Sequence, residues 1–281
     1  MTEPDDLARA RQELGEPDAL FQISPSWFRT KLLVGLALIA GGVAGFALWG
    51  LVGWRAFHVF AHFVLWPLGT GVVLLVNLYR QRGLFVLIYP TGLLRLRQGE
   101  VESFPWDEVA EVRLKTQKVE TVVLVRGPDG VPVGCWLPAE VPSVQVWTAG
   151  LTVVRADGAT VHFSPVLAGY AELAEEVQRR SFPPLWKVTI ARFNDGRMLP
   201  FGKLEVSLLG IHFAGKLLPW SEVGKLTVAQ GGLTVSQRRK WLPFAVAKPA
   251  AEVPNLHILF ALAAYAVGEQ PGAEPDPDPE S

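Results

Sequence analysis

The sequence predicts an α+β membrane protein in which a two-helix transmembrane hairpin is followed by two related β-rich modules, each closed by a C-terminal helix. Three observations predict this class. Two long segments near the start contain no Asp, Glu, Lys or Arg, and a Pro-Trp-x-Glu-Val stretch occurs at residues 105–109 and again at 219–223. After each copy, strand-like patterns give way to a single helical pattern. With 281 residues, the chain is long enough to form more than one compact unit.

The first 30 residues are predicted to be a polar cytoplasmic tail, in which residues 5–20 either form a short helix or stay solvated. Residues 31–80 are predicted to form the hairpin, because the stretches 32–54 and 56–79 lack charged side chains and each exceeds the about 20 residues that a membrane span needs. A cleaved signal peptide is the competing interpretation. The acidic start and the length of the apolar run favour a retained anchor.

Cations mark the orientation of this hairpin. Arg29 and Lys31 precede the first span and Arg80 and Arg82 follow the second, whereas Arg55 alone lies in the turn. Since positive residues stay on the cytoplasmic side, the sequence predicts an integral protein of the cytoplasmic (inner) membrane with both termini in the cytoplasm.

Residues 84–182 are predicted to form the first module and residues 187–269 the second. Short β-prone runs flank Asp157-Gly158 and Pro128-Asp129-Gly130, which are hairpin signals. A helical pattern starts near Ser164, and Pro183-Pro184 is expected to end it and to serve as a linker. The strands then begin again at residues 188–193 and turn at residues 194–196. Residues 256–267 supply the second closing helix, and the acidic, proline-rich residues 270–281 are expected to be disordered.

The repeated Pro-Trp-x-Glu-Val motif is interpreted as structural. Trp106 and Trp220 are expected to turn inward as anchors, and Glu108 and Glu222 to remain exposed. The glutamates would otherwise be candidates for acid or base chemistry. No histidine, serine or second carboxylate stands at matching positions in both copies, which favours the structural role.

This pattern of strands, a Gly…Pro-Trp-x-Glu-Val turn and one terminal helix after a two-helix anchor resembles bacterial membrane-anchored PH-like (pleckstrin-homology-like) domain proteins, largely of unknown function. The resemblance covers residues 84–180 and 187–269. It implies two tandem β-barrels or sandwiches, each plugged by its helix, that act as binding platforms rather than as enzymes. The basic cluster of headgroup-binding PH domains is absent from residues 194–197, which argues against phosphoinositide recognition there.

Two further patterns in the hairpin leave alternatives open. His58 and His62 are spaced for one helix face, where they either hold a metal or, as the missing third ligand favours, make interfacial or interhelical hydrogen bonds. The glycines in residues 41–45 permit close helix packing, either within the hairpin or in a dimer.

Two possible contact surfaces lie in the second module. The basic patch Arg238, Arg239, Lys240 and Trp241 is either a solvated hairpin tip or a contact with the membrane or a partner. The closing helix is apolar nearly all round, so its outer face, with Ile258, Leu262 and Tyr265, is expected to lie against the first module, the membrane or another chain.

The net charge of −1 gives no general attraction to nucleic acid, and the single cysteine, Cys135, excludes an internal disulfide. No nucleophile elbow, phosphate loop, dinucleotide fingerprint or zinc-protease motif is present. No catalytic residue, cofactor or metal is therefore assigned. The preferred hypothesis is a non-enzymatic membrane protein whose modules bind a protein, peptide or lipid partner. The rivals are a membrane enzyme using Glu108, Glu222 or His212, and a module serving only homo-oligomer assembly.

Overall fold

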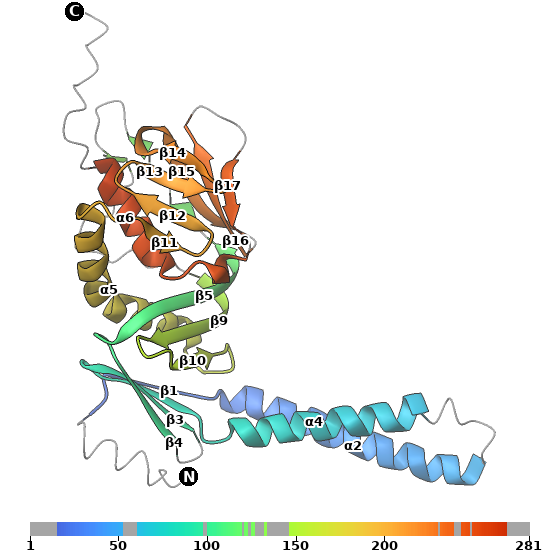
Figure 1. Cartoon of the computed structure of the whole chain (residues 1–281). Helices are drawn as coiled ribbons and strands as arrows, with labels where there is room; N and C mark the ends of the chain where they lie inside the picture. Colours follow the sequence, from blue (N-terminus) through green and yellow to red (C-terminus); the bar gives the residue numbers. More distant parts are fainter. Residues whose placement is uncertain are drawn as a thin grey trace, which may run out of the picture. The chain divides into compact units, whose positions relative to one another are not determined.

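The computed structural model describes residues 16–52, 61–97, 100–119, 121–122, 125–126, 132–133, 146–229, 231–238, 243–247 and 249–268 (Figure 1). The chain divides into two compact units. Unit 1 contains Met1–Ser103 and Val166–Ala168, and unit 2 contains Phe104–Pro165 and Gly169–Ser281. The α+β class is confirmed, since helices accompany several antiparallel sheets. Within the described residues none of these sheets closes into a barrel.

Unit 1 contains a four-stranded sheet in the order β1-β2-β3-β4, except for the last two residues of β4, which belong to unit 2. Its strands are β1 (Ala19–Gln22), β2 (Phe85–Ile88), β3 (Gly92–Arg97) and β4 (Glu100–Pro105). β1 pairs antiparallel with β2, from Ala19 opposite Ile88 to Gln22 opposite Phe85. In the part of unit 1 that the structure describes, all the helical residues therefore lie between two strands that are paired neighbours. Residues 19–22 are predicted from the sequence to belong to the tail, because four residues are too short to show a clear period.

The helices of unit 1 are α2 (Pro25–Val52), the π-helical turn η2 (Ala61–Leu65) and α4 (Trp66–Gln81), into which η2 passes directly. α2 begins at Pro25, where a proline is tolerated because the first helical N–H has no partner within the helix. Among the described residues, one helix is long and apolar enough to span a membrane, Pro25–Leu48. α2 and α4 lie side by side in Figure 1.

Glycines bring α2 and α4 into close contact. A Cβ atom on Gly71 would lie 2.9 Å from the carbonyl oxygen of Gly35 and 3.2 Å from the backbone nitrogen of Ile39. A Cβ on Gly42 would lie 2.5 Å from Leu68. Gly35 next to Gly71 and Gly42 next to Leu68 set an antiparallel register. Of the glycines 41–45, Gly42 thus packs within the hairpin, whereas Gly41 has nothing within 4 Å of its Cβ position.

Replacing Gly71 with alanine should loosen the hairpin. The added methyl group meets backbone atoms of α2, which cannot rotate away as a side chain can, and overpacking of this kind costs about 1–3 kcal/mol. We expect the protein to unfold at a lower temperature, as followed by circular dichroism. Gly69→Ala is the matched control, because open space surrounds Gly69 and alanine favours the helix. Equal melting temperatures for the two variants would contradict this packing.

Unit 2 begins with a three-stranded sheet in the order β10-β9-β5, formed by β5 (Val109–Val119), β9 (Val146–Arg155) and β10 (Thr160–Phe163). The hairpin between β9 and β10 turns at Asp157-Gly158, where Gly158 has a φ of +89°. Among the described residues between β5 and β9 are three short strands, β6 (Thr121–Val122), β7 (Val125–Arg126) and β8 (Pro132–Val133). Helix α5 (Tyr170–Asn194) contacts β5 and β9. The predicted turn at residues 128–130 lies outside the described residues.

Two further sheets follow α5. The first has the order β11-β12-β13-β14 and contains β11 (Leu199–Phe201), β12 (Leu204–Ser207), β13 (Gly210–Phe213) and β14 (Lys216–Pro219). The second has the order β17-β16-β15-β6 and contains β15 (Val223–Ala229), β16 (Gly232–Gln237) and β17 (Pro243–Ala247). The 3₁₀ turn η3 (Trp220–Glu222) joins the two sheets, and η4 (Ala250–Glu252) precedes the last helix, α6 (Leu256–Gly268).

The prediction that Pro183-Pro184 ends the first closing helix is wrong. α5 continues through both prolines to Asn194, so residues 188–193 are helical rather than a strand. The prolines remove two N–H donors, which would normally end a helix. Buried residues on both sides of the break, including Val177, Ser181, Leu185 and Phe193, supply packing that local sequence rules do not count.

Both ends of α5 also differ from the prediction. The helix starts at Tyr170, after Gly169 with a φ of +71°, and not near Ser164. Residues 195–196 end the helix instead of joining two strands. The N–H of Asp195 donates to the carbonyl of Ala191, and Gly196 has a φ of +74°. An Asp-Gly pair suits a helix end and a hairpin equally, because both require a residue with positive φ.

Candidate functional site

The second Pro-Trp-x-Glu-Val copy forms a tight corner between two sheets. β14 ends at Pro219, and Trp220 is 2% exposed. Its indole Nε1–H donates to the backbone carbonyl of Ser207 at 3.0 Å, and its ring lies edge-on to that of Phe193, with centroids 6.5 Å apart. Val223 then starts β15 as a fully buried side chain. This tryptophan joins α5 to the β12–β13 turn.

The first copy has the same local arrangement. β4 ends at Pro105, and both Trp106 and Val109 are buried. The carbonyl of Glu108 accepts the N–H of Ala156 at 2.8 Å, just as the carbonyl of Glu222 accepts that of Arg238 at 2.7 Å. In both copies the glutamate carbonyl thus accepts a hydrogen bond from the residue that follows a strand of the next sheet, β9 in the first copy and β16 in the second.

The carboxylates of the two glutamates are exposed and have nearby polar partners. Glu108 lies 3.8 Å from Nε of Arg155, and Glu222 accepts a hydrogen bond from Gln237 at 3.2 Å. Arg155 binds Asp157 more closely, and this hydrogen bond lowers the pKa of Asp157 to about 2. These contacts stabilise the β9–β10 turn and the motif corner.

His212, the histidine named by the enzyme hypothesis, lies on β13 beside a serine. Its Nε2 is 2.9 Å from Oγ of Ser207, which are the atoms that a nucleophile and a base would present. The same hydroxyl accepts the N–H of Leu209 at 3.3 Å and lies 3.5 Å from the carbonyl of Gly210, and Ser207 is 8% exposed. These contacts hold the hydroxyl inside the β12–β13 turn. A Cβ on Gly210 would lie 2.0 Å from the carbonyl oxygen of Leu218, so only glycine fits there.

The apolar residues of the second closing helix lie inside unit 2. Ile258 and Leu262 are fully buried. The ring of Tyr265 packs edge-on against Trp186 and Phe193, at centroid distances of 6.0 and 6.3 Å. Both partners belong to the part of α5 that follows the two prolines. α5 therefore packs on this face of α6.

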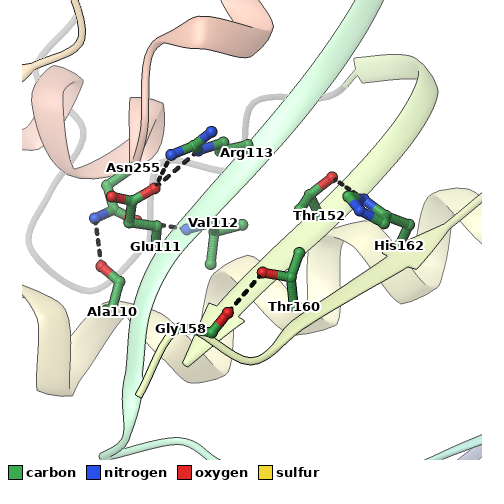
Figure 2. Close-up of polar contacts among 9 residues, drawn as sticks. All are labelled: Ala110, Glu111, Val112, Arg113, Thr152, Gly158, Thr160, His162 and Asn255. Carbon is green, nitrogen blue, oxygen red and sulfur yellow. Dashed lines mark hydrogen bonds and ion pairs between the residues drawn. The ribbon is translucent and has the colours of Figure 1, made fainter. Parts of the chain in front are cut away.

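Sequence reasoning missed Asn255, which precedes α6. Figure 2 shows its side chain at the outer edge of β5, where Nδ2 donates to the carbonyl of Ala110 at 2.9 Å and Oδ1 accepts the N–H of Val112 at 2.7 Å. Its own N–H donates to the carbonyl of Val112. Asn255 has a φ of +51°, a conformation that asparagine tolerates better than most residues. An asparagine before an apolar helical run suggests a helix cap. Here its side-chain amide instead bonds the backbone groups of β5 that a neighbouring strand would otherwise bond.

The exposed face of the β10-β9-β5 sheet carries a polar row that sequence reasoning also missed. Arg113 lies opposite Thr152, which lies opposite His162. The hydroxyl of Thr152 is 2.8 Å from Nδ1 of His162, and Arg113 donates to Glu111 at 2.8 Å from its Nε (Figure 2). No pattern in the sequence singles out these residues, because they come together only through strand register.

The remaining candidates are placed only in part. His62 lies exposed in η2, and Arg238 is exposed after β16. His58, Arg239, Lys240 and Trp241 lie outside the described residues, as do Cys135 and residues 270–281. Within the described parts of the chain, no group of three or more His, Cys, Asp or Glu side chains is arranged to hold a metal ion.

One family model matches the chain, over residues 141–271, and its description is "Family of unknown function (DUF6585)". The match spans just under half of the chain and includes β9 through α6. No curated protein and no solved structure matches this sequence. The comparisons therefore attach no activity to the site residues described above.

Proposed function

We propose that this protein is a non-enzymatic integral membrane protein that presents tandem PH-like binding modules at the cytoplasmic face of the membrane. The observation that carries the proposal is the apolar surface of α2. Side chains such as Leu33, Leu36, Val43 and Phe46 point outward and are 66%, 49%, 57% and 56% exposed. Exposed apolar surface of this extent on a long helix is typical of helices that contact the hydrocarbon core of a membrane.

The second span of the proposed hairpin is formed by η2 and α4. Leu65, Trp66, Val72, Val73 and Val76 are exposed along these helices as well. The antiparallel register set by Gly35 and Gly71 brings the start of α2 and the end of α4 to the same end of the hairpin. Arg29, Lys31, Arg80 and Arg82 lie at this end. From the positive-inside rule we infer that this end of the hairpin faces the cytoplasm. The chain segments that precede α2 and follow α4 would then lie in the cytoplasm as well.

The order of elements along the chain supports a repeat of two modules. In the second copy, four strands (β11 to β14) lead into the Pro-Trp-x-Glu-Val corner, three strands (β15 to β17) follow, and α6 closes the order. The first copy has β1 to β4, the same corner, and β5, β9 and β10, with the short strands β6, β7 and β8 between β5 and β9; α5 then follows. On this reading the membrane hairpin is an insertion into the first β-hairpin of the first copy, between β1 and β2. PH-like sandwiches bind partners on such scaffolds, so we infer a protein, peptide or lipid ligand.

The membrane part of this proposal has a direct test. The full chain should remain in the membrane pellet after alkaline carbonate extraction. The double variant Leu36→Arg and Val43→Arg should move into the supernatant, since each arginine at a span centre costs about 2.5–3.5 kcal/mol. Val101→Arg with Val246→Arg is the matched control, because these exposed valines lie on strands. Release of the unsubstituted chain by carbonate would contradict the anchor.

The binding part is tested by isolating the full chain in native lipid particles and comparing it with the hairpin alone. We expect a partner to be enriched only with the full chain. Recovery of nothing above the anchor-only control would contradict the binding role.

A further inference from the structure

We propose that the base of the helical hairpin forms a binding site for anionic phospholipid headgroups, an inference that rests on the proposed membrane anchor. The site consists of Arg29, Lys31, Arg80, Arg82 and Arg97, which we call the collar. Its ligand is the phosphodiester of a lipid with net negative charge.

The charge distribution along the chain singles out this region. The whole chain has a net charge of −1, yet residues 19–99 contain no Asp or Glu. The same stretch contains the five collar cations together with Arg55 and Arg95. The positive charge of residues 19–99 is therefore local, and the first acids on either side of this stretch are Asp18 and Glu100. A headgroup layer of negative charge is the complement that such a stretch requires.

Helices α2 and α4 bring four of the collar cations to one end of the hairpin. Arg29 and Lys31 lie in the first turns of α2, and Arg80 lies in the last turn of α4, which is adjacent in the antiparallel register. Arg82 caps α4, and its N–H donates to the carbonyl of Tyr79 at 3.1 Å.

Arg97 joins the collar from the sheet. Its Nε–H donates to the carbonyl of Arg80 at 3.3 Å, which fixes the guanidinium of a β3 residue against the end of α4. That bond uses one of the five N–H donors of the side chain. The other four can donate to a phosphate, for which the planar arginine fork is well suited. Four of the five collar cations are arginines.

Neighbouring carboxylates leave the collar positive. Glu102 pairs with Arg95 at 2.8 Å, an arginine outside the collar. Along the sequence, the first acids outside the collar residues are the exposed Asp18, before Arg29, and the exposed Glu100, after Arg97. The five cations outnumber these two carboxylates, so the collar keeps a net positive charge.

Aromatic side chains indicate that the collar lies at the depth of the headgroups. The ammonium group of Lys31 lies 6.0 Å from the centre of the Trp27 ring, and Tyr79 is 69% exposed beside Arg80. Tryptophan and tyrosine concentrate at the boundary between hydrocarbon and headgroups. The cations next to them therefore meet phosphates rather than acyl chains or bulk water.

The test compares spin-labelled lipids in vesicles of phosphatidylcholine that contain the full-length protein. We expect spin-labelled phosphatidylglycerol to associate with the protein more strongly than spin-labelled phosphatidylcholine. The double variant Arg80→Gln and Arg82→Gln should reduce this preference by about thirtyfold, which corresponds to about 1 kcal/mol for each cation near an anionic surface. Arg192→Gln with Arg197→Gln is the matched control, since it removes two exposed cations from unit 2 and should leave the preference unchanged.

The outcomes separate this inference from the anchor. An equal preference for both lipids, or an equal loss in the collar and control variants, would overturn the collar. Displacement of phosphatidylglycerol by millimolar inorganic phosphate would also overturn it, because the site would then hold free phosphate. Failure of the unsubstituted protein to stay in the vesicles after an alkaline wash would instead remove the anchor. If the α4 variant does not insert, Arg29→Gln with Lys31→Gln measures the same loss from α2.

Discussion

Replacing Leu262 with glutamate should unfold the helical part of unit 2. Leu262 is fully buried in α6, which packs against α5, η3 and β5. A carboxylate introduced there has no water around it, and unpaired buried charges belong to the small group of substitutions that cost about 4 kcal/mol or more. We expect loss of the near-ultraviolet circular dichroism and a lower unfolding temperature in detergent, with aggregation detected by gel filtration.

Leu209→Glu provides the matched control for this substitution. Leu209 is 69% exposed in the β12–β13 turn, and exposed sites of this kind change stability by about 0.5 kcal/mol or less. Unchanged melting and unchanged size for Leu262→Glu would show that the environment of α6 is not the closed interface described here.

Acidification should destabilise the protein through His257, which follows Leu256 at the start of α6. His257 is fully buried beside Phe182, with ring centroids 6.2 Å apart, and neither ring nitrogen has a hydrogen-bond partner among the described residues. Burial disfavours the imidazolium and lowers the pKa of His257 from 6.5 to about 3. Unfolding restores the ordinary value.

The sign of the pH effect follows from this difference. Above about pH 6.5 the imidazole is neutral in both states, so the full stability is present. Between pH 6.5 and about 3 the unfolded chain binds a proton that the folded chain does not, and stability falls by about 1.4 kcal/mol for each pH unit. Asp157 and Glu176, whose pKa values are lowered by hydrogen bonds to arginines despite partial burial of Glu176, lose their contributions only below about pH 4.5.

The measurement is the free energy of unfolding between pH 7 and pH 5, where His257 dominates. The variant His257→Leu should flatten this dependence, whereas His162→Gln, at an exposed position on β10, should leave it unchanged. A slope that survives His257→Leu would assign the pH dependence to another group.

The hairpin region shows which structural features a sequence pattern can predict and which it cannot. An uncharged stretch of more than twenty residues predicts a bilayer-length helix, because the cost of charge in hydrocarbon outweighs every local preference. The pattern does not reveal that β1 precedes the hairpin and pairs with β2. A strand of four residues is stable only when it pairs with a partner strand, because its own contacts do not offset the loss of conformational entropy.

The closing helices show the opposite case. Local rules end α5 at Pro183-Pro184, because two missing N–H donors normally break a helix. The helix continues because Phe182, Trp186 and Phe193 pack on α6, with Tyr265 and His257 among their ring partners. The apolar character of α6 predicts that it is covered on all sides, but the identity of the covering element depends on residues about 70 positions away in the sequence.

What the sequence by itself determined is the composition-driven part of this protein: the α+β class, the long apolar helix α2, and the two Pro-Trp-x-Glu-Val corners. These follow from side chains whose burial or exposure depends on chemistry alone. Only the tertiary structure determined that Asn255 pairs with the edge of β5 and that α5 continues past Pro183-Pro184. The same holds for the burial of His257 without a hydrogen-bond partner for its ring nitrogens among the described residues. Each of these depends on contacts between distant segments, whose packing energy exceeds the local preferences that a sequence displays.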